Sequence, residues 1–197
     1  MAEKRMVSIG VWMMLALIGA IGQIIPHAPN FAPVAATALF AGFFFRAKRI
    51  AILAPAVALI CHDIVLNPYN FGVVVFVITG LMFPVLWGSV LRCEIPERIQ
   101  RTRIFRLLYA PLLLGGCSFV SSIVFFVLSN FGVWAFTGMY PLTVSGIITC
   151  YSAALPFFRY TVTGDFFYGA IFFGSYVCAQ KVAQWQRVPH TASAEGR

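Results

Sequence analysis

Long apolar segments fill most of this 197-residue chain, and most of its charged residues lie in the short stretches between or beside them. Hydrophobic residues make up 60% of the chain and charged residues only 10%, whereas about a quarter of the residues in a soluble domain are charged. A chain of this length has too little interior to hide so much apolar surface from water. The sequence therefore predicts an all-α, polytopic membrane protein.

Six segments are predicted to cross the membrane, because a crossing takes about 20 apolar residues. They cover residues 7–25, 31–45, 50–66, 71–91, 107–129 and 161–183. Residues 143–155 are too apolar for an ordinary loop, and glycines and prolines interrupt the region around them, so we expect an interfacial or re-entrant helix there. The prediction is a bundle of six transmembrane helices forming one membrane domain over residues 1–185, followed by a polar cytoplasmic tail at 186–197.

The distribution of basic residues predicts the orientation of this bundle. Threading the six segments in alternation puts 13 of the 14 Lys and Arg residues on the side of the two termini, and only Arg159 on the other side. By the positive-inside rule both termini are cytoplasmic, as expected for a bacterial inner-membrane protein. The net charge of +8 thus reflects orientation beside anionic lipid headgroups and does not indicate nucleic-acid binding.

Polar and aromatic side chains gather near the predicted outer ends of the helices. Asp63 and Asp165 are the only acidic residues within the predicted crossings, and a carboxylate that faced lipid there would cost about 2.5–3.5 kcal/mol. Polar groups and amphipathic aromatics around a depression are typical of a small-molecule site. The predicted substrate-binding set is His27, Asn30, His62, Asp63, Asn70, Asn130, Trp134, Tyr140, Arg159, Asp165 and Tyr168.

Structural roles compete with binding for several of these residues. Asn30 and Asn70 precede predicted helices, so helix capping explains them about as well as binding does. Arg159 and Asp165 would also suit a structural ion pair. A metal site at Cys61, His62 and Asp63 is disfavoured, because consecutive helical residues point about 100° apart, and we expect no metal or cofactor. The chain carries no catalytic motif, so we expect no enzyme.

Small residues recur at helical spacing on the first two predicted helices. Ala16 with Ala20, and Ala32 with Ala36, form pairs that let helix backbones approach closely in lipid. Two interpretations remain open for these pairs: packing inside the bundle, or docking of a partner membrane subunit.

Several motifs resemble an uncharacterised family of small bacterial membrane proteins that is similar to the S components of energy-coupling factor (ECF) transporters. The motifs are PHAPNFAPVAA at 26–36, NFGVW at 130–134, YP at 140–141, and PFFRYT at 156–161 with GD at 164–165. The family usually has Ser-Asp where this chain has His62-Asp63, so only the aspartate carries over. The resemblance implies an outward pocket lined by Asp63, Asn130, Arg159 and Asp165, and alanine-rich helices that meet an ECF-type scaffold subunit with its ATPases.

The leading functional hypothesis is a substrate-binding membrane component for uptake of a small polar solute, vitamin-like or metal-related, that lacks its own ATPase. The alternative is a non-transporting scaffold or assembly subunit of a cell-envelope complex. The first hypothesis depends on the outer polar residues and the second on the arginine-rich segment 92–106.

Overall fold

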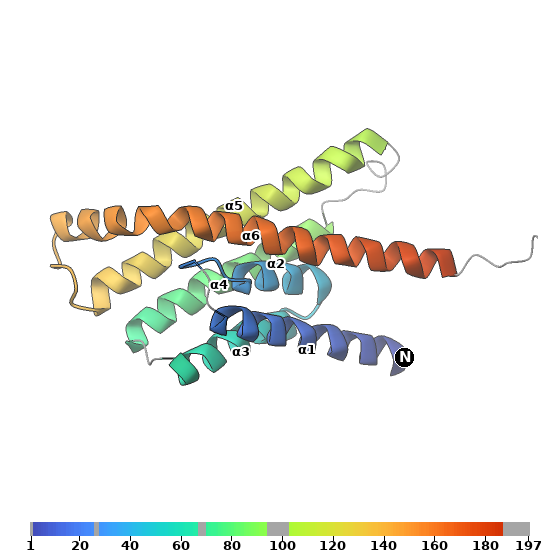
Figure 1. Ribbon diagram of the computed structural model, residues 1–197, viewed down its shortest axis with the longest axis horizontal. Coiled ribbons are helices and arrows are strands. Elements are labelled where there is room, and N and C mark those ends of the chain that lie inside the picture. Colours follow the sequence, from blue (N-terminus) through green and yellow to red (C-terminus); the bar gives the residue numbers. More distant parts are fainter. Residues whose placement is uncertain (1, 26–27, 67–69, 94–102, 187–197) are drawn as a thin grey trace, which may run out of the picture.

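The computed structural model describes residues 2–25, 28–66, 70–93 and 103–186, without the side chains of residues 2–4, 61–66, 93, 103–108 and 110. This part of the chain forms six α-helices: α1 (Ala2–Ile24), α2 (Val34–Phe44), α3 (Lys48–Leu66), α4 (Phe71–Cys93), α5 (Arg103–Phe136) and α6 (Val144–Gln186). Successive helices run in opposite directions, so the bundle has two ends (Figure 1). We call the end with the α1–α2 and α5–α6 connections the cavity end, and the other the basic end.

Three of the helices are long and apolar enough to cross a membrane. The apolar stretches are Arg5–Ile24 in α1, Phe71–Arg92 in α4 and Pro111–Phe136 in α5. An all-α membrane protein, as the composition predicts, therefore agrees with the lengths of these helices.

The second predicted crossing needs correction, because only part of residues 31–45 is helical. Helix α2 has 11 residues, about 16 Å at 1.5 Å per residue, which is roughly half the thickness of a bilayer's hydrocarbon core. Pro29 and Pro33 explain the late start, since proline disfavours helical geometry in the residue before it. Helix α2 contacts each of the other five helices, and nine consecutive residues from Val34 to Gly42 are buried.

The prediction of a separate interfacial or re-entrant helix over residues 143–155 was also wrong. These residues begin α6, which continues through Pro156 for 43 residues, about 64 Å, along most of the molecule (Figure 1). A proline inside a helix costs about 3 kcal/mol, and packing on α5 offsets that cost. The Tyr151 hydroxyl donates to the Val127 carbonyl at 2.7 Å, and the rings of Phe126 and Phe158 lie 4.9 Å apart.

An arginine from α4 holds the C-terminal end of α2. The last carbonyls of a helix have no partners within it. The Arg92 guanidinium donates to three of them: Nε to the Phe43 oxygen at 2.6 Å, and Nη2 to the Gly42 and Phe45 oxygens at 2.5 and 2.6 Å. This contact fixes α2 against α4 at the basic end.

Helices α2 and α4 approach so closely that their backbones touch. A methyl group added at Gly42 would lie 2.1 Å from the Val85 carbonyl oxygen, and one at Gly88 would lie 2.1 Å from the Leu39 carbonyl oxygen. No Cβ atom fits at such distances, so both positions require glycine for this packing.

The alanines predicted to dock a partner lie largely within the bundle. Ala36 is 2% exposed and Ala16 is 8% exposed, while Ala20 and Ala32 are partly buried. Internal packing accounts for Ala16 and Ala36, and docking at these alanines stays a prediction.

We expect Arg92→Met to destabilise the bundle, because it keeps much of the side-chain length but leaves three carbonyls of α2 without their donor. Unsatisfied buried polar groups cost about 1–3 kcal/mol each, so the unfolding temperature in detergent should fall by several degrees. Lys181→Met is the control, since Lys181 is exposed; an equal effect of both substitutions would contradict the role given to Arg92.

We expect Gly42→Ala to destabilise the protein by about 1–3 kcal/mol, as overpacking does. Gly174→Ala is the matched control, because nothing lies within 4 Å of a methyl group added there. The control should be neutral or stabilising by up to about 1 kcal/mol, since alanine favours a helix more than glycine does. Thermal unfolding of the two variants in the same detergent measures the difference, and similar unfolding temperatures would refute the close packing.

Candidate functional site

A cavity of about 470 Å³ lies at the cavity end, around the start of α2. All six helices or their connections contribute to its wall, because α2 is too short to fill the bundle at this end. The lining residues are Gln23, Pro29, Asn30, Ala32, Val34, Ala35, Leu59, Val73, Val74, Val77, Leu81, Phe125, Ser129, Asn130, Val133, Thr161 and Asp165.

The connection before α2 turns sharply beside the cavity. The Phe31 N–H donates to the Ala28 carbonyl at 3.0 Å, which closes a turn with Pro29 and Asn30 in its centre. Asn30 has a φ of 64°, a left-handed conformation that asparagine adopts more readily than most residues. The Phe31 backbone then passes close to α6, where a methyl group at Gly164 would lie 3.3 Å from the Phe31 Cα.

Asp165 is the most buried polar residue of the cavity wall. It is 3% exposed and lies on α6 one turn after Thr161, which also lines the cavity. The Ser122 hydroxyl of α5 lies 2.5 Å from Asp165 Oδ2 and 3.1 Å from the Ser118 carbonyl oxygen. The carboxylate is thereby placed at the contact between α5 and α6, at the edge of the cavity.

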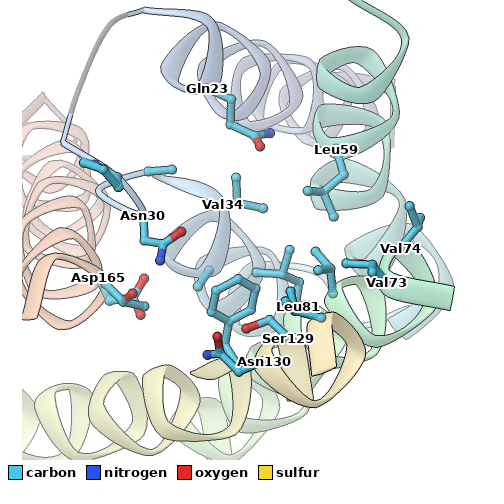
Figure 2. A pocket seen from close by; sticks show the side chains of 17 residues that line it. Gln23, Asn30, Val34, Leu59, Val73, Val74, Leu81, Ser129, Asn130 and Asp165 are labelled. Carbon is cyan, nitrogen blue, oxygen red and sulfur yellow. The ribbon is translucent and has the colours of Figure 1, made fainter. Parts of the chain in front are cut away.

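The two walls of the cavity differ in polarity. Asn30 and Asp165 lie on one side, and Leu59 and Val74 lie on the opposite side, with Gln23 above them (Figure 2). The polar side comes from the α1–α2 connection, α5 and α6, whereas the apolar side comes from α3 and α4. Such a site can hold a solute that has both a polar and an apolar part.

Two predicted site residues, Asn70 and Trp134, have contacts outside this cavity. Asn70 caps α4, because its Oδ1 accepts from the Gly72 N–H at 2.9 Å, and its Nδ2 donates to the Phe136 carbonyl at 2.9 Å. The Trp134 indole donates to the Pro141 carbonyl at 3.0 Å. The contacts of Asn70 therefore agree with helix capping, the structural alternative to a role in binding.

Arg159 does not pair with Asp165 in the described part of the chain. Its guanidinium donates to the Tyr160 hydroxyl at 2.7 Å and lies 4.6 Å from the centre of that ring. Arg159 is exposed, and a separation of six residues puts it on another face of α6 from Asp165. Tyr140 and Tyr168 are partly buried and do not line the cavity, although the Tyr168 ring packs 5.6 Å from that of Phe31.

The structure thus brings Asn30, Asn130 and Asp165 of the predicted set together. His27 and the side chains of His62 and Asp63 lie outside the described residues. Position 63 follows the cavity residue Leu59 by about one turn of α3, so the hypothesis for Asp63 stays a prediction.

Gln23 and Ser129 line the cavity but do not belong to the predicted set. Gln23 is a polar residue in an apolar stretch, three residues before the proline-rich segment that begins at Pro26, and this position was an available signal. Ser129 ends the predicted fifth crossing, and nothing in its local sequence distinguishes it from a helix-terminal serine.

Comparison with known proteins places the chain in a family. A family model described as a family of unknown function, DUF6580, matches residues 3–189. No curated protein and no solved structure matches the chain. The match agrees with the predicted resemblance to an uncharacterised family, while the resemblance to ECF S components stays a prediction. The chain belongs to the DUF6580 family.

Proposed function

We propose that this protein is a substrate-binding membrane component that captures a small polar solute for uptake. The observation that carries the proposal is the cavity around the start of α2, with buried Asp165 in its wall. Polar groups at membrane depth are costly and are kept where they line a cavity or a pathway. Non-helical backbone at that depth is tolerated for the same reason, and the α1–α2 connection provides it here.

The orientation of the bundle is part of this proposal. Arg46, Lys48 and Arg49 lie in or beside the α2–α3 connection at the basic end, and Arg5 and Lys181 lie on the helix segments that reach that end (Figure 1). The positive-inside rule then favours a cytoplasmic basic end and a cavity that opens outward, in a bundle of six crossings. Solute would enter from outside, and a separate energising module, as in the ECF resemblance, would drive its release.

Capture of a solute accounts for the cavity better than the alternative of an assembly subunit does. An assembly subunit needs outer surfaces that bind its partners, and it gains nothing from a hollow, partly polar interior. A buried carboxylate also costs stability unless a positive charge pairs with it, and Ser122 gives Asp165 only a neutral hydroxyl, so the presence of Asp165 favours a role in binding.

The proposal predicts that filling the cavity abolishes capture. Val77 lines the cavity, whereas Val75, two residues earlier on α4, is 44% exposed. We expect Val77→Phe to lower the occupancy of a co-purifying small molecule at least about tenfold, because the added ring occupies the site, a loss of about 1.4 kcal/mol in binding. Native mass spectrometry of protein purified in mild detergent measures this occupancy.

Val75→Phe is the control with the same change in volume, and it should retain the compound. Equal occupancy in both variants would show that the compound binds elsewhere. A wild-type protein that retains no small molecule, even after incubation with a metabolite extract, would overturn the proposed function.

A further inference from the structure

We propose that the cavity selects an amphipathic organic cation, with Asp165 as the counter-charge to its positively charged group. This inference rests on the proposed function and names the class of solute. It follows from the charge of the cavity wall, the hydrogen-bonding capacity of its side chains, and the contrast between its two sides.

The described cavity wall carries one charged side chain, Asp165. Arg159, the nearby cation on the same helix, is exposed and engaged with Tyr160, so it does not neutralise the carboxylate. A buried ionised carboxylate without a positive partner is strongly unfavourable. A cation in the cavity would supply the missing charge.

The hydrogen bonds around Asp165 are one donor short. A serine hydroxyl has one proton to donate, yet the Ser122 oxygen lies 2.5 Å from Asp165 Oδ2 and 3.1 Å from the Ser118 carbonyl. One proton cannot satisfy both acceptors fully. An ammonium or similar group in the cavity would give Asp165 a donor that it does not share with the Ser118 carbonyl.

Two amide side chains of the wall present acceptors to the cavity. The Gln23 Nε2 donates to the Gly19 and Ala58 carbonyls at 3.4 and 3.2 Å, and the Asn130 Nδ2 donates to the Phe126 carbonyl at 2.7 Å. Of the two ends of an amide side chain, only the NH₂ group can donate to a carbonyl oxygen, so these contacts fix which way each amide points. The amide oxygens of Gln23 and Asn130 are left to accept hydrogen bonds, as donor-rich cations require.

The start of α2 also borders the cavity and favours negative charge. A helix N-terminus carries about half a unit of positive charge, and Pro33 at the cap position provides no side-chain hydrogen bond to the helix. An ionised Asp165 carries a full negative charge, which exceeds this partial charge, so the described wall is negative overall when Asp165 is ionised. An anionic solute would meet that carboxylate without a described cation to bind it.

The apolar side of the cavity favours an organic cation over a hydrated inorganic ion. Five aliphatic side chains form this side: Leu59, Val73, Val74, Val77 and Leu81. They offer no ligands to a metal ion, but they bury the hydrocarbon part of an organic solute at about 25 cal/mol per Å². A cavity of about 470 Å³ falls within the range of sites for small organic molecules.

The test uses probes of similar size that differ in their polar head group, which is a cation, a neutral hydroxyl or an anion. Purified protein in mild detergent is incubated with an equimolar mixture of phenethylamine, phenethyl alcohol and phenylacetate, together with the hexyl equivalents of all three. Native mass spectrometry identifies which probes are retained. We expect the amines to be retained at least about tenfold more than the alcohols and carboxylates, the ratio that one charge-assisted hydrogen bond provides.

Two substitutions link this selectivity to the cavity. Asp165→Asn preserves shape and should remove the preference for amines. Because that variant places an amide in a buried site, Asn30→Asp serves as a second variant: Asn30 is exposed and aspartate tolerates its left-handed backbone. Asn30→Asp should increase amine retention several-fold, whereas Gln180→Glu, with the same charge change at an exposed position far along α6, should not.

The outcomes separate this inference from the proposed function. Preferential retention of the carboxylates or alcohols, or an amine preference that survives Asp165→Asn, would overturn the cation inference while leaving solute capture intact. Retention of none of the probes would also overturn it. If, in addition, the protein retains nothing from a metabolite extract, the proposed function fails as well.

Discussion

The structure depends on how the backbone N–H and carbonyl groups at the two ends of the short helix α2 find partners inside the bundle. Every helix leaves four N–H groups and four carbonyls without partners at its ends, and within a membrane protein water is not freely available to satisfy them. Helix α2 meets this constraint differently at its two ends. Its carbonyl end receives three hydrogen bonds from Arg92, whereas its amide end has no side-chain cap and borders the cavity. The hollow at one end is thus a consequence of the short helix that the other end anchors.

This arrangement also explains why small residues are concentrated where they are. A helix that touches five others must let several backbones approach at once, and Gly42 and Gly88 permit contact between the α2 and α4 backbones. Ala38 and Ala41 are completely buried on the same helix. Without a hydrophobic driving force between helices in lipid, close packing of this kind provides much of the association energy. The alanine-rich sequence therefore serves the central position of α2.

The sequence predicted the all-α class and part of the candidate site, because both follow from local patterns. Thirty-one aromatic residues and long aliphatic runs indicate a membrane environment, and the spacing of Thr161 and Asp165 by four residues puts them on one helical face. The length of α2 was missed because hydropathy does not distinguish helix from apolar loop, although Pro29 and Pro33 marked the break. The continuity of α6 through Pro156 depends on contacts with α5, and the position of Arg159 depends on its ring contact with Tyr160. Neither set of contacts can be read from local sequence.

The polar side of the cavity continues into the contact between α5 and α6. Ser118, Ser121 and Ser122 are all buried there, and the Ser121 and Ser122 hydroxyls each reach the carbonyl four residues earlier. A serine that bonds to its own helix satisfies itself at little cost, so these residues can line a buried contact without a ligand. Asp165 has no such local solution, because a carboxylate only accepts hydrogen bonds when ionised. In the described part of the chain it is the one member of this polar row whose requirements exceed what its neighbours donate, and it lies where the row meets the cavity. The packing of α5 and α6 thus supports the carboxylate on the side away from the cavity. Any further donor to Asp165 has to come from the cavity, as the proposed binding of a solute requires.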